Sequence, residues 1–543
     1  MVIIQNQDYR CRLRDFLSYL SIYLLVSVAY LPSGTSFNLH QPSYHELYHK
    51  KNQNIVFALK VIGENHAGQE GIVKDLLTKA KAEEGSGFYV HIPYCRRRCR
   101  YCDFPIVPVG THNEDGNEGF KAMDKEYCDA LLDEIDFYHE PAAKKNKVSS
   151  IYFGGGTPSL APISTLRAVL KRICRQFDVS LSPSSNDKED SVEITMELDP
   201  GTFTKNQLEE YKQLGVNRIS LGVQALNDTV LEQIGRIHRV KDVFQAVDML
   251  KSVFRDELNY SLDLISGLPG VTLAQWAETL EIVVRDLKPT HLSIYDLQIE
   301  KGTVFGRWYP NNDENTVSEN SPSIMKARAM PLPSPEECAY MYCYASGYLR
   351  HKGYKHYEIS SYSQSDKRSR HNQIYWGYQP EWYAIGLGAT SSFPRSHRFT
   401  RPKTMSDYLT WVKQQKQKQV NNDDDSYRNQ PPWLYDANAT ESADNEQDEE
   451  EDQDQQLSDI IMTRLRTSDG LNLDWLEQHY SKDIVESVLD GAQLGVDLGL
   501  AKIEIEHEQP NNVTKTRVLR LVDPKGFLFS NTIISSIFVE VMA

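Results

Sequence analysis

Between residues 88 and 297 the chain alternates short β-branched runs with longer stretches whose apolar residues recur at helical spacing. Six runs have the character of strands: 88–92, 150–153, 192–198, 218–223, 260–266 and 291–297. Helical patterns lie between them at 119–139, 163–177, 204–214, 240–254 and 272–286. Such alternation requires parallel strands joined by right-handed crossovers. It therefore predicts an α/β fold, either a doubly wound sheet or a partial (β/α)6 TIM-like barrel.

Polar or glycine-rich residues follow the ends of these predicted strands. They are a cysteine group after the first strand, Gly154 to Ser159 after the second, Glu197 at the third, Gln224 at the fourth and Asp263 at the fifth. In β/α barrels the active site is built at the carboxyl ends of the strands. The sequence therefore predicts a site at that rim.

The cysteine group has the spacing CxxxCxxC, with Cys95, Cys99 and Cys102 in a loop directly after a strand. Soft thiolate ligands select iron–sulfur clusters or zinc. A structural zinc normally has four ligands, and no fourth cysteine follows nearby. Three thiolates on a four-iron cluster would leave one iron open for substrate. The alternative is a zinc-stabilised binding module whose site is completed by His91.

Four arginines, Arg96, Arg97, Arg98 and Arg100, interleave with these cysteines. They are either a solvated charge run or a device that raises the reduction potential of an anionic cluster and attracts an acidic electron donor. The chain as a whole has 59 basic and 75 acidic residues, a net charge of −16, which argues against a nucleic-acid partner. Residues 421–454 hold 13 acidic residues and one arginine, so most of this charge belongs to one segment.

Several motifs together resemble a known family. The triplet resembles the radical S-adenosylmethionine (radical SAM) superfamily. The strings HIPYCRRRCRYCDF, IYFGGGTPS, MELDPGT, ISLGVQ, IGRIH and DLISGLPG resemble its oxygen-independent coproporphyrinogen III oxidase branch. Within that branch the chain is most similar to the HemW-like proteins, which include the eukaryotic radical SAM domain-containing protein 1.

The resemblance implies a 4Fe-4S cluster on the three cysteines, with SAM on the open iron. One electron would cleave SAM to methionine and a 5′-deoxyadenosyl radical, and a reduced ferredoxin or flavodoxin-type protein would donate it. By position, the resemblance assigns the SAM contacts to Tyr89, Gly155, Gly156, Thr157, Glu197, Gln224, Arg236 and Asp263. These residue types suit SAM binding, because glycine lets the methionyl group of SAM approach the backbone closely and Arg236 can pair with the carboxylate of SAM.

Two features distinguish the classes within this branch. The coproporphyrinogen oxidases carry a further cysteine two positions after the triplet, where this chain has Phe104, so decarboxylase activity is not expected. The HemW-like proteins resemble the chain in an HNxxYW motif, which begins at His371 and ends with Tyr375 and Trp376. The resemblance implies haem binding, with His371 on the iron, and a haem chaperone that passes haem to an acceptor protein. The alternative is a coproporphyrinogen III oxidase.

The remainder of the chain divides by composition. Residues 457–525 read as two helices and short strands, a small helical or winged-helix-like module with too few basic residues for a phosphate footprint. We expect a targeting segment and lead-in (1–85), the barrel (86–310), a flexible insertion (311–335), a haem-motif region (336–413), an acidic disordered insertion (414–456) and a C-terminal HemN-like domain (457–543).

The first residues have the parts of a signal peptide: Arg10, Arg12 and Arg14, an apolar run over 16–31, and small residues at 33–36. The run is short for a membrane span, and the alternative is a buried core helix. A simple signal peptide would send the chain into an oxidising lumen, where its reactive thiols would be lost. We therefore expect a two-part address into a plastid-like organelle, with the second part beginning at Phe37, or mitochondrial import. The cytoplasm is the alternative, and any membrane contact would be through this segment or an acceptor.

Overall fold

The computed structural model describes residues 85–110, 118–138, 146–181, 191–310, 329–365, 367–378, 380–393, 398–421, 446–507 and 515–542. The predicted targeting segment and the middle of the acidic insertion lie outside these residues. Within the described part of the chain, no helix is both long and apolar enough to cross a membrane.

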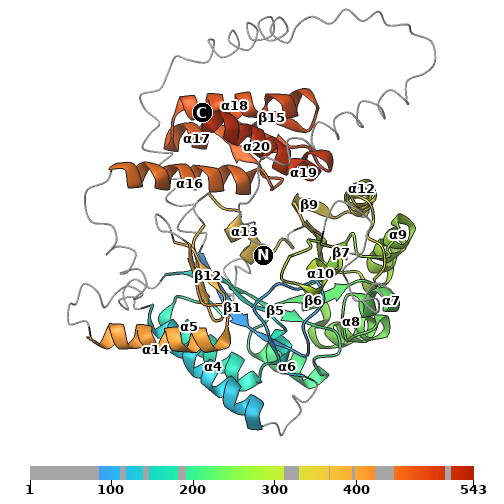
Figure 1. Ribbon diagram of the computed structural model, residues 1–543, viewed down its shortest axis with the longest axis vertical. Coiled ribbons are helices and arrows are strands. Elements are labelled where there is room, and N and C mark those ends of the chain that lie inside the picture. Colours follow the sequence, from blue (N-terminus) through green and yellow to red (C-terminus); the bar gives the residue numbers. More distant parts are fainter. Residues whose placement is uncertain are drawn as a thin grey trace, which may run out of the picture. The chain divides into compact units, whose positions relative to one another are not determined.

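One nine-stranded sheet organises the barrel (Figure 1). Its order is β11 (Trp382–Ile385), β1 (Ser86–Ile92), β4 (Val148–Gly155), β5 (Glu193–Leu198), β6 (Arg218–Gln224), β7 (Tyr260–Ser266), β8 (His291–Asp296), β10 (Ser361–Ser363) and β9 (Lys355–Glu358). The six predicted strands are confirmed as the contiguous parallel run from β1 to β8. The edge strands were not predicted: β11 pairs parallel with β1, whereas β10 pairs antiparallel with β8 and β9.

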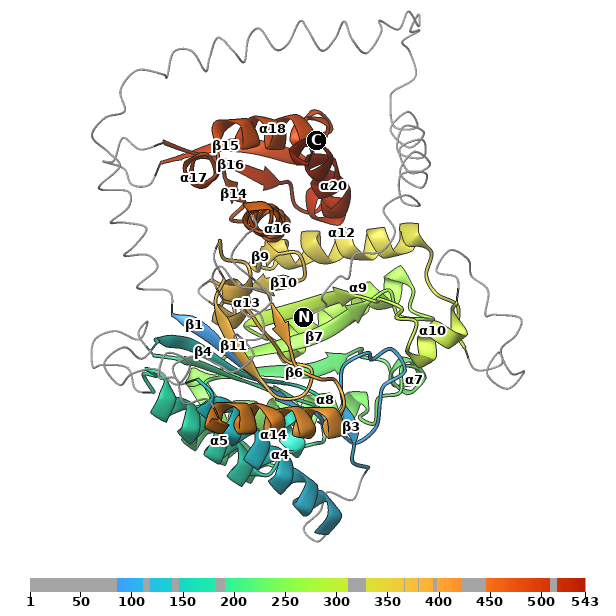
Figure 2. The ribbon, with the colours of Figure 1, turned by 60° about the vertical axis from the view of Figure 1, so that its left-hand side comes forward.

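Helices cover the outer face of this sheet (Figure 2). They are α4 (Glu118–Asp136), α5 (Ile163–Gln176), α6 (Lys205–Gln213), α8 (Val240–Phe254), α9 (Leu273–Ile282) and α12 (Pro335–His351). Helices α7 (Asp228–Gln233) and α10 (Val304–Trp308) instead pack together in a separate apolar cluster beside the cysteine loop. The five helical patterns in the sequence match α4, α5, α6, α8 and α9, the last continuing as a π-helix over Val283–Leu287. Local signals fix the starts of α6 and α9, where Thr204 with Gln207 and Thr272 with Gln275 form capping boxes.

Alternation along each strand gives the sheet two different faces. Phe88, Val90 and Ile92 of β1 are fully buried and belong to the apolar core that includes helix residues. The opposite face is polar: Ser150, Thr195, Arg218, Ser261 and His291 are buried there on successive strands. Serine and histidine side chains on this inner face hydrogen-bond to each other, as Ser261 Oγ does to His291 Nδ1 at 2.8 Å, whereas the buried Thr195 Oγ1 and Arg218 Nε have no hydrogen-bond partner among the described residues.

The C-terminal module has its own core and confirms the predicted pattern of helices followed by strands. It contains α16 (Glu446–Arg464), α17 (Leu473–His479), α18 (Lys482–Asp497) and a sheet of β14 (Leu471–Asn472), β16 (Lys515–Leu521) and β15 (Ala501–His507). Two further helices, α19 (Lys525–Leu528) and α20 (Ser530–Val541), follow and were not predicted. Helices α18 and α20 approach closely, since a Cβ on Gly491 would lie 2.5 Å from Ile537 Cα.

The limits expected for the two insertions were wrong. Helix α14 (Met405–Asn421) continues past residue 414, where Lys416 Nζ lies 2.6 Å from Asp133 of α4. Helix α16 begins at residue 446, because glutamate and glutamine are good helix formers and extend the helix that buries Leu457. In the first insertion, residues 329–335 are ordered: Pro331 accepts a 2.8 Å hydrogen bond from Gly270 N.

A buried ion pair ties the β11 edge of the sheet to α4. Arg401 Nε lies 2.7 Å from Glu134 Oε1, and neither side chain is exposed to solvent. Glu134 also accepts hydrogen bonds from Tyr408 Oη at 2.6 Å and Gly386 N at 2.9 Å. Removing one member of such a pair leaves an uncompensated buried charge.

We therefore expect Arg401→Met to lower the free energy of unfolding by about 3–5 kcal/mol in urea denaturation. The control is Lys413→Met, which breaks the exposed pair with Glu126 and should stay within about 1 kcal/mol of wild type. Equal effects of the two substitutions would contradict this account of the β11 edge.

Candidate functional site

The three cysteines lie on a short loop at the carboxyl end of β1. The loop begins in β2 (Tyr94–Cys95), which pairs with β3 (Val107–Pro108), and Cys95 O accepts a 2.8 Å hydrogen bond from Val109 N. Cys102 N donates to Cys99 O at 3.3 Å, which closes a turn between the second and third thiols. All three thiols are half-buried and unbridged. The backbone of the loop is therefore fixed by hydrogen bonds, with the three thiols unbridged.

The arginines of this loop hold its conformation. Arg97 donates to the carbonyls of Gly235 at 2.7 Å and Arg236 at 2.6 Å, from the segment after α7. Arg98 donates to Phe104 O at 2.9 Å. Arg100 donates to Gln233 O at 2.5 Å, and its guanidinium lies 5.0 Å from the Trp308 ring. The acceptors of Arg97 and Arg98 are neutral carbonyl groups, so these two arginines brace the loop while keeping positive charge beside the thiols.

Two polar groups face the sulfur atoms directly. Thr157 Oγ1 lies 3.6 Å from Cys95 Sγ, and Arg236 Nη1 lies 3.7 Å from Cys99 Sγ. Burial raises the pKa of the Cys95 thiol to about 12 and that of Cys102 to about 11. The metal-free protein therefore holds these two as neutral thiols, and binding of a metal cluster would release their protons.

The chemistry of these donors fits a polynuclear cluster better than a single zinc ion. Within the described residues, no three His, Cys, Asp or Glu side chains converge on one ion position. His91, the fourth ligand in the zinc alternative, is buried, with Nε2 2.8 Å from Pro105 O and Nδ1 3.1 Å from Tyr89 Oη. Both of its ring nitrogens are thus already engaged.

The glycine turn after β4 packs against the cysteine loop. Gly155 has φ +112°, and a Cβ there would lie 2.4 Å from the His91 ring. A Cβ on Gly156 would lie 2.7 Å from the backbone of Pro93 and Tyr94. The amides are engaged too: Gly156 N donates to Ile92 O at 2.8 Å. Glycine is therefore required here for close packing between the turn and the loop.

Glu197, at the end of β5, is a half-buried carboxyl among aromatic neighbours. It accepts hydrogen bonds from Tyr152 Oη at 2.8 Å and Gly155 N at 3.0 Å. Burial raises the pKa of Glu197 to about 7, and the negative charge of Asp263 adds to this rise. Asp263 accepts a 2.9 Å hydrogen bond from Ser220 Oγ, and burial raises its pKa as well. The predicted carboxylates thus lie together on the inner face.

Arg236 makes an ion pair with Asp199 and donates to Gly222 O at 2.8 Å. Asp199 also accepts from Thr157 Oγ1 at 3.2 Å, so it links the glycine turn to the arginine that faces Cys99. Asp199 was not among the predicted site residues. The signal was present, because Asp199 directly follows β5 in the string MELDP.

Gln224 completes the predicted rim at the end of β6. Its φ is +65°, a left-handed conformation that is costly for a residue with a Cβ. The pairing of β6 with β7 shifts register between Gly222 and Gln224. This irregularity at the rim changes the direction of the Gln224 side chain, which is half-buried. Tyr89, from the middle of β1, stacks on Tyr152 with ring centroids 6.1 Å apart and so joins the same group.

The HNxxYW motif forms the short helix α13 (Arg370–Tyr375), which contacts β1 and β4. His371 is 2% exposed. Its Nδ1 lies 2.8 Å from Ser150 Oγ, and its Nε2 lies 2.8 Å from Tyr375 Oη. Its main-chain N–H is directed at Glu193, the first residue of β5. His371 therefore lies toward the amino-terminal ends of the strands, whereas the cysteines lie at the carboxyl ends.

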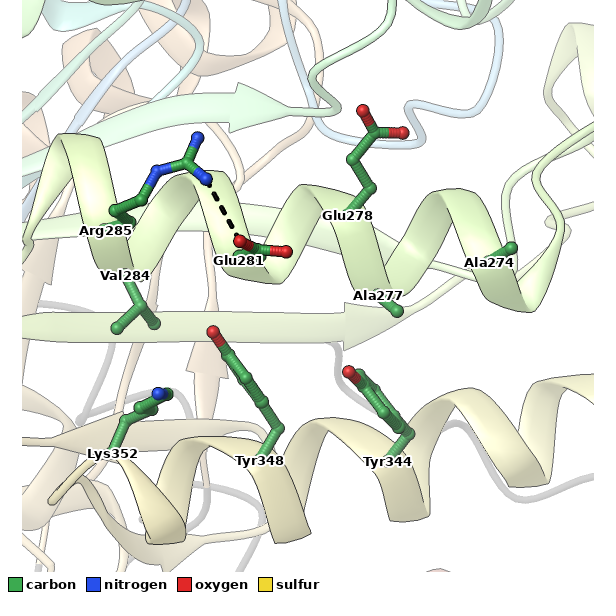
Figure 3. A pocket seen from close by; sticks show the side chains of 9 residues that line it. All are labelled: Ala274, Ala277, Glu278, Glu281, Val284, Arg285, Tyr344, Tyr348 and Lys352. Atoms are coloured by element: carbon green, nitrogen blue, oxygen red, sulfur yellow. Dashed lines mark hydrogen bonds and ion pairs between the residues drawn. The ribbon is translucent and has the colours of Figure 1, made fainter.

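A surface cleft of about 720 Å³ lies between α9 and α12, lined in part by Tyr344, Tyr348 and Lys352 (Figure 3). The Tyr344 and Tyr348 rings are stacked with centroids 5.8 Å apart, and Arg285 on the opposite side pairs with Glu281. None of the predicted site residues lines this cleft.

Comparisons with known proteins agree with this geometry. Residues 89–283 match the Radical SAM superfamily. The chain is 33% identical over 457 residues to the heme chaperone HemW of Synechocystis sp., covering 83% of this chain and 95% of that protein. It is 30% identical over 315 residues to the mitochondrial radical S-adenosyl methionine domain-containing protein 1 of Bos taurus, covering 58% of this chain and 62% of that protein.

Among solved structures, coproporphyrinogen III oxidase (HemN) from Escherichia coli, described as a radical SAM enzyme, is similar in fold. The TM-score is 0.58 at 19% identity, covering 89% of this chain and 98% of that chain. At this identity the likeness concerns the fold alone, and it confirms the α/β architecture expected from the alternation of strands and helices.

The raised pKa of Glu197 makes stability depend on pH. An unfolded glutamate has a pKa near 4.5, whereas the pKa of folded Glu197 is about 7, so the folded carboxyl keeps its proton over this range. The raised pKa therefore costs no stability below pH 4.5, and wild type loses stability as pH rises from 4.5 to 7, above which the loss levels off. In cluster-free protein, Glu197→Gln should gain stability over wild type by up to about 1.4 kcal/mol per pH unit across this window.

Urea denaturation at several pH values measures this difference, with the exposed Glu209→Gln as control. A difference between Glu197→Gln and wild type that stays constant from pH 4.5 to 7 would show that Glu197 titrates normally.

Proposed function

We propose a haem-chaperone function for this chain, which belongs to the HemW family of radical SAM proteins. In this proposal the protein binds haem and transfers it to an acceptor protein. The observation that carries the proposal is the similarity to a heme chaperone HemW over 95% of that protein's length. The residues at the carboxyl ends of the strands and those of α13 support it.

Cys95, Cys99 and Cys102 are the residues that would hold a 4Fe-4S cluster. Together with SAM, such a cluster supplies one-electron chemistry when bound. Arg236 and Thr157 face the sulfur atoms at 3.7 and 3.6 Å, so they stabilise negative charge on the ligands. The ion pair with Asp199 fixes the arginine in this position.

The proposed SAM contacts are Tyr89, Gly155, Gly156, Thr157, Glu197, Gln224, Arg236 and Asp263. Their support is that all of them lie on the inner face or the carboxyl rim of the sheet, and that Gly156, Thr157 and Arg236 contact the cysteine loop. Glu197 and Asp263 can hold a cationic or hydroxylated ligand, because carboxylates accept charge-assisted hydrogen bonds. The turn at Gly155 and Gly156 would contribute to the SAM site through its shape. The amides of Gly156 and Thr157 already donate hydrogen bonds to the segment that leads into the cysteine loop.

The surface around the cysteine loop suits an acidic electron donor of the reduced ferredoxin or flavodoxin type. Arg97 and Arg98 are exposed there. Phe104 and Ile237, 44% and 41% exposed, add apolar area close to the thiols. Positive charge combined with exposed apolar residues favours association with an acidic protein.

A coproporphyrinogen III oxidase is the second candidate, because the fold is similar to that of HemN. Phe104 stands where that branch of the family carries a further cysteine, and this difference favours the chaperone. No nucleic-acid partner is proposed.

For localisation we propose an organelle, a plastid or a mitochondrion, on the strength of the basic and apolar N-terminal segment and of a relative that is named mitochondrial. Any membrane contact would come from that segment or from the acceptor.

His371 is the proposed axial ligand of the haem iron, with Tyr375 and Trp376 against the macrocycle. Its donor chemistry fits: burial lowers the pKa of His371 to about 3, so the imidazole is neutral, and a neutral imidazole nitrogen is what iron requires. Ser150 holds Nδ1, as the outer partner of a metal-bound histidine usually does.

His371→Gln tests the proposal, because glutamine keeps hydrogen-bonding capacity but ligates haem iron poorly. Titration with haemin should show a changed Soret band and at least roughly a tenfold weaker affinity than wild type. His479→Gln on α17, an exposed histidine, is the matched control and should bind as wild type does. An unchanged Soret band and affinity in His371→Gln would remove this residue as the ligand.

A further inference from the structure

We propose that Tyr375 is a positioning residue that caps the ligating nitrogen of His371, and that haem reaches His371 only after α13 leaves the sheet. The inference rests on the proposed haem binding at His371. It adds a closed state, held by the C-terminal module, in which this nitrogen is unavailable.

The cap is defined by one contact. Tyr375 Oη lies 2.8 Å from His371 Nε2, one helical turn along α13. An iron ligated by Nε2 would have to lie in the same direction at about 2 Å, the usual length of a metal–imidazole bond. Tyrosine oxygen and iron cannot both occupy that direction, whichever tautomer the imidazole adopts. Since Ser150 already occupies the Nδ1 side, Nε2 is the nitrogen left for a metal.

The packing around the imidazole leaves no route for a macrocycle. The His371 ring stacks on Tyr152, with centroids 4.9 Å apart. On the β1 side, a Cβ on Gly87 would lie 3.3 Å from the His371 ring. Tyr375 is itself held edge-on by Trp382 of β11, at 4.7 Å. Because His371 is only 2% exposed and these groups enclose its ring, we infer that the helix must move for a porphyrin to reach it.

Contacts from the C-terminal module restrain that movement. Arg464, the last residue of α16, donates from Nη1 to Trp376 O at 2.8 Å, directly after α13. Its guanidinium also lies 4.6 Å from the Tyr378 ring. Tyr378 Oη in turn accepts a 2.6 Å hydrogen bond from Asn472 N of β14.

A second contact holds the other end of α13. Arg368, before the helix, lies 3.0 Å from Asp469 of the module. A helix of six residues is unstable alone, so α13 depends on tertiary contacts such as these and can be released when they break. The module thus controls whether His371 is available.

The test is Tyr375→Phe, which removes the capping hydroxyl and keeps the ring against Trp382. Because a typical hydrogen bond contributes about 0.5–1.5 kcal/mol, stopped-flow haemin association should become roughly three- to tenfold faster. The gain should vanish in the double variant with His371→Gln. The matched control is Tyr383→Phe, another buried tyrosine with hydrogen-bond partners, and it should associate as wild type does.

A purely structural role for Tyr375 predicts the opposite, a lower unfolding midpoint with unchanged or slower haemin association, and that result would overturn the proposal. If Tyr375→Phe does not fold, Arg464→Met provides the second variant. It removes the contact to Trp376 O while keeping an apolar stem, and should also accelerate association. Association at the wild-type rate in folded Arg464→Met would overturn the restraint by the module.

A measurement without haem separates this inference from the proposed function. Diethyl pyrocarbonate modifies accessible imidazole nitrogens, and mass spectrometry reports the modification of His371 in the haem-free protein. His371 should be protected in wild type and modified several-fold faster in Tyr375→Phe. Equal rates would overturn the cap even if haem binds. Failure of wild type to bind haemin would instead refute the haem-chaperone function and leave the cap to be judged by the modification rates.

Discussion

Parallel pairing of β1 with β4, and of each following strand with the next, brings the chemically distinctive residues to one edge. The carboxyl ends of parallel strands meet at the same rim. Residues far apart in sequence, such as Cys95, Thr157 and Asp199, therefore become neighbours. The glycine turn after β4 fits against the cysteine loop only because Gly155 and Gly156 lack a Cβ. Any change in register would separate these groups, since one residue of slip turns every side chain to the other face.

The second constraint is the polar inner face. A face lined by serine, histidine, arginine and carboxylate side chains is unfavourable to bury unless its members hydrogen-bond to one another. The hydroxyls of Ser150, Ser220 and Ser261 meet this need at three strands. The consequence is chemical, because neutral histidines and an easily protonated Glu197 result from burial beside fixed partners. The same face provides the surface that α13 covers.

Much of the fold followed from periodicity. Strands β1 and β4 to β8 and five outer helices were predicted because their apolar residues repeat with the period of each element. Edge strands such as β11 are too short to give such a signal, and helix α20 lies beyond residue 525, where the predicted pattern of helices and strands ended. Acidic composition suggested disorder up to residue 456, but α16 begins earlier because packing of Leu457 stabilises a preceding run of helix formers.

The site residues that stand at the ends of strands were predictable from the sequence. Spacing placed His371 and Tyr375 one turn apart, but it gave no indication that Ser150 and Tyr152 would enclose the imidazole, because those contacts come from β4. Asp199 stands at a strand end, but the sequence did not show which residue it would pair with. Its partner Arg236 is remote in sequence, and only the folded rim brings the two together.

The central claim is that this chain carries haem and does not oxidise coproporphyrinogen. The most direct measurement is an anaerobic reaction of the cluster-reconstituted protein with SAM, a reductant and coproporphyrinogen III, followed by analysis of the tetrapyrrole products. The account predicts that coproporphyrinogen is recovered unchanged by a protein preparation that binds haem stoichiometrically. Formation of protoporphyrinogen would contradict it.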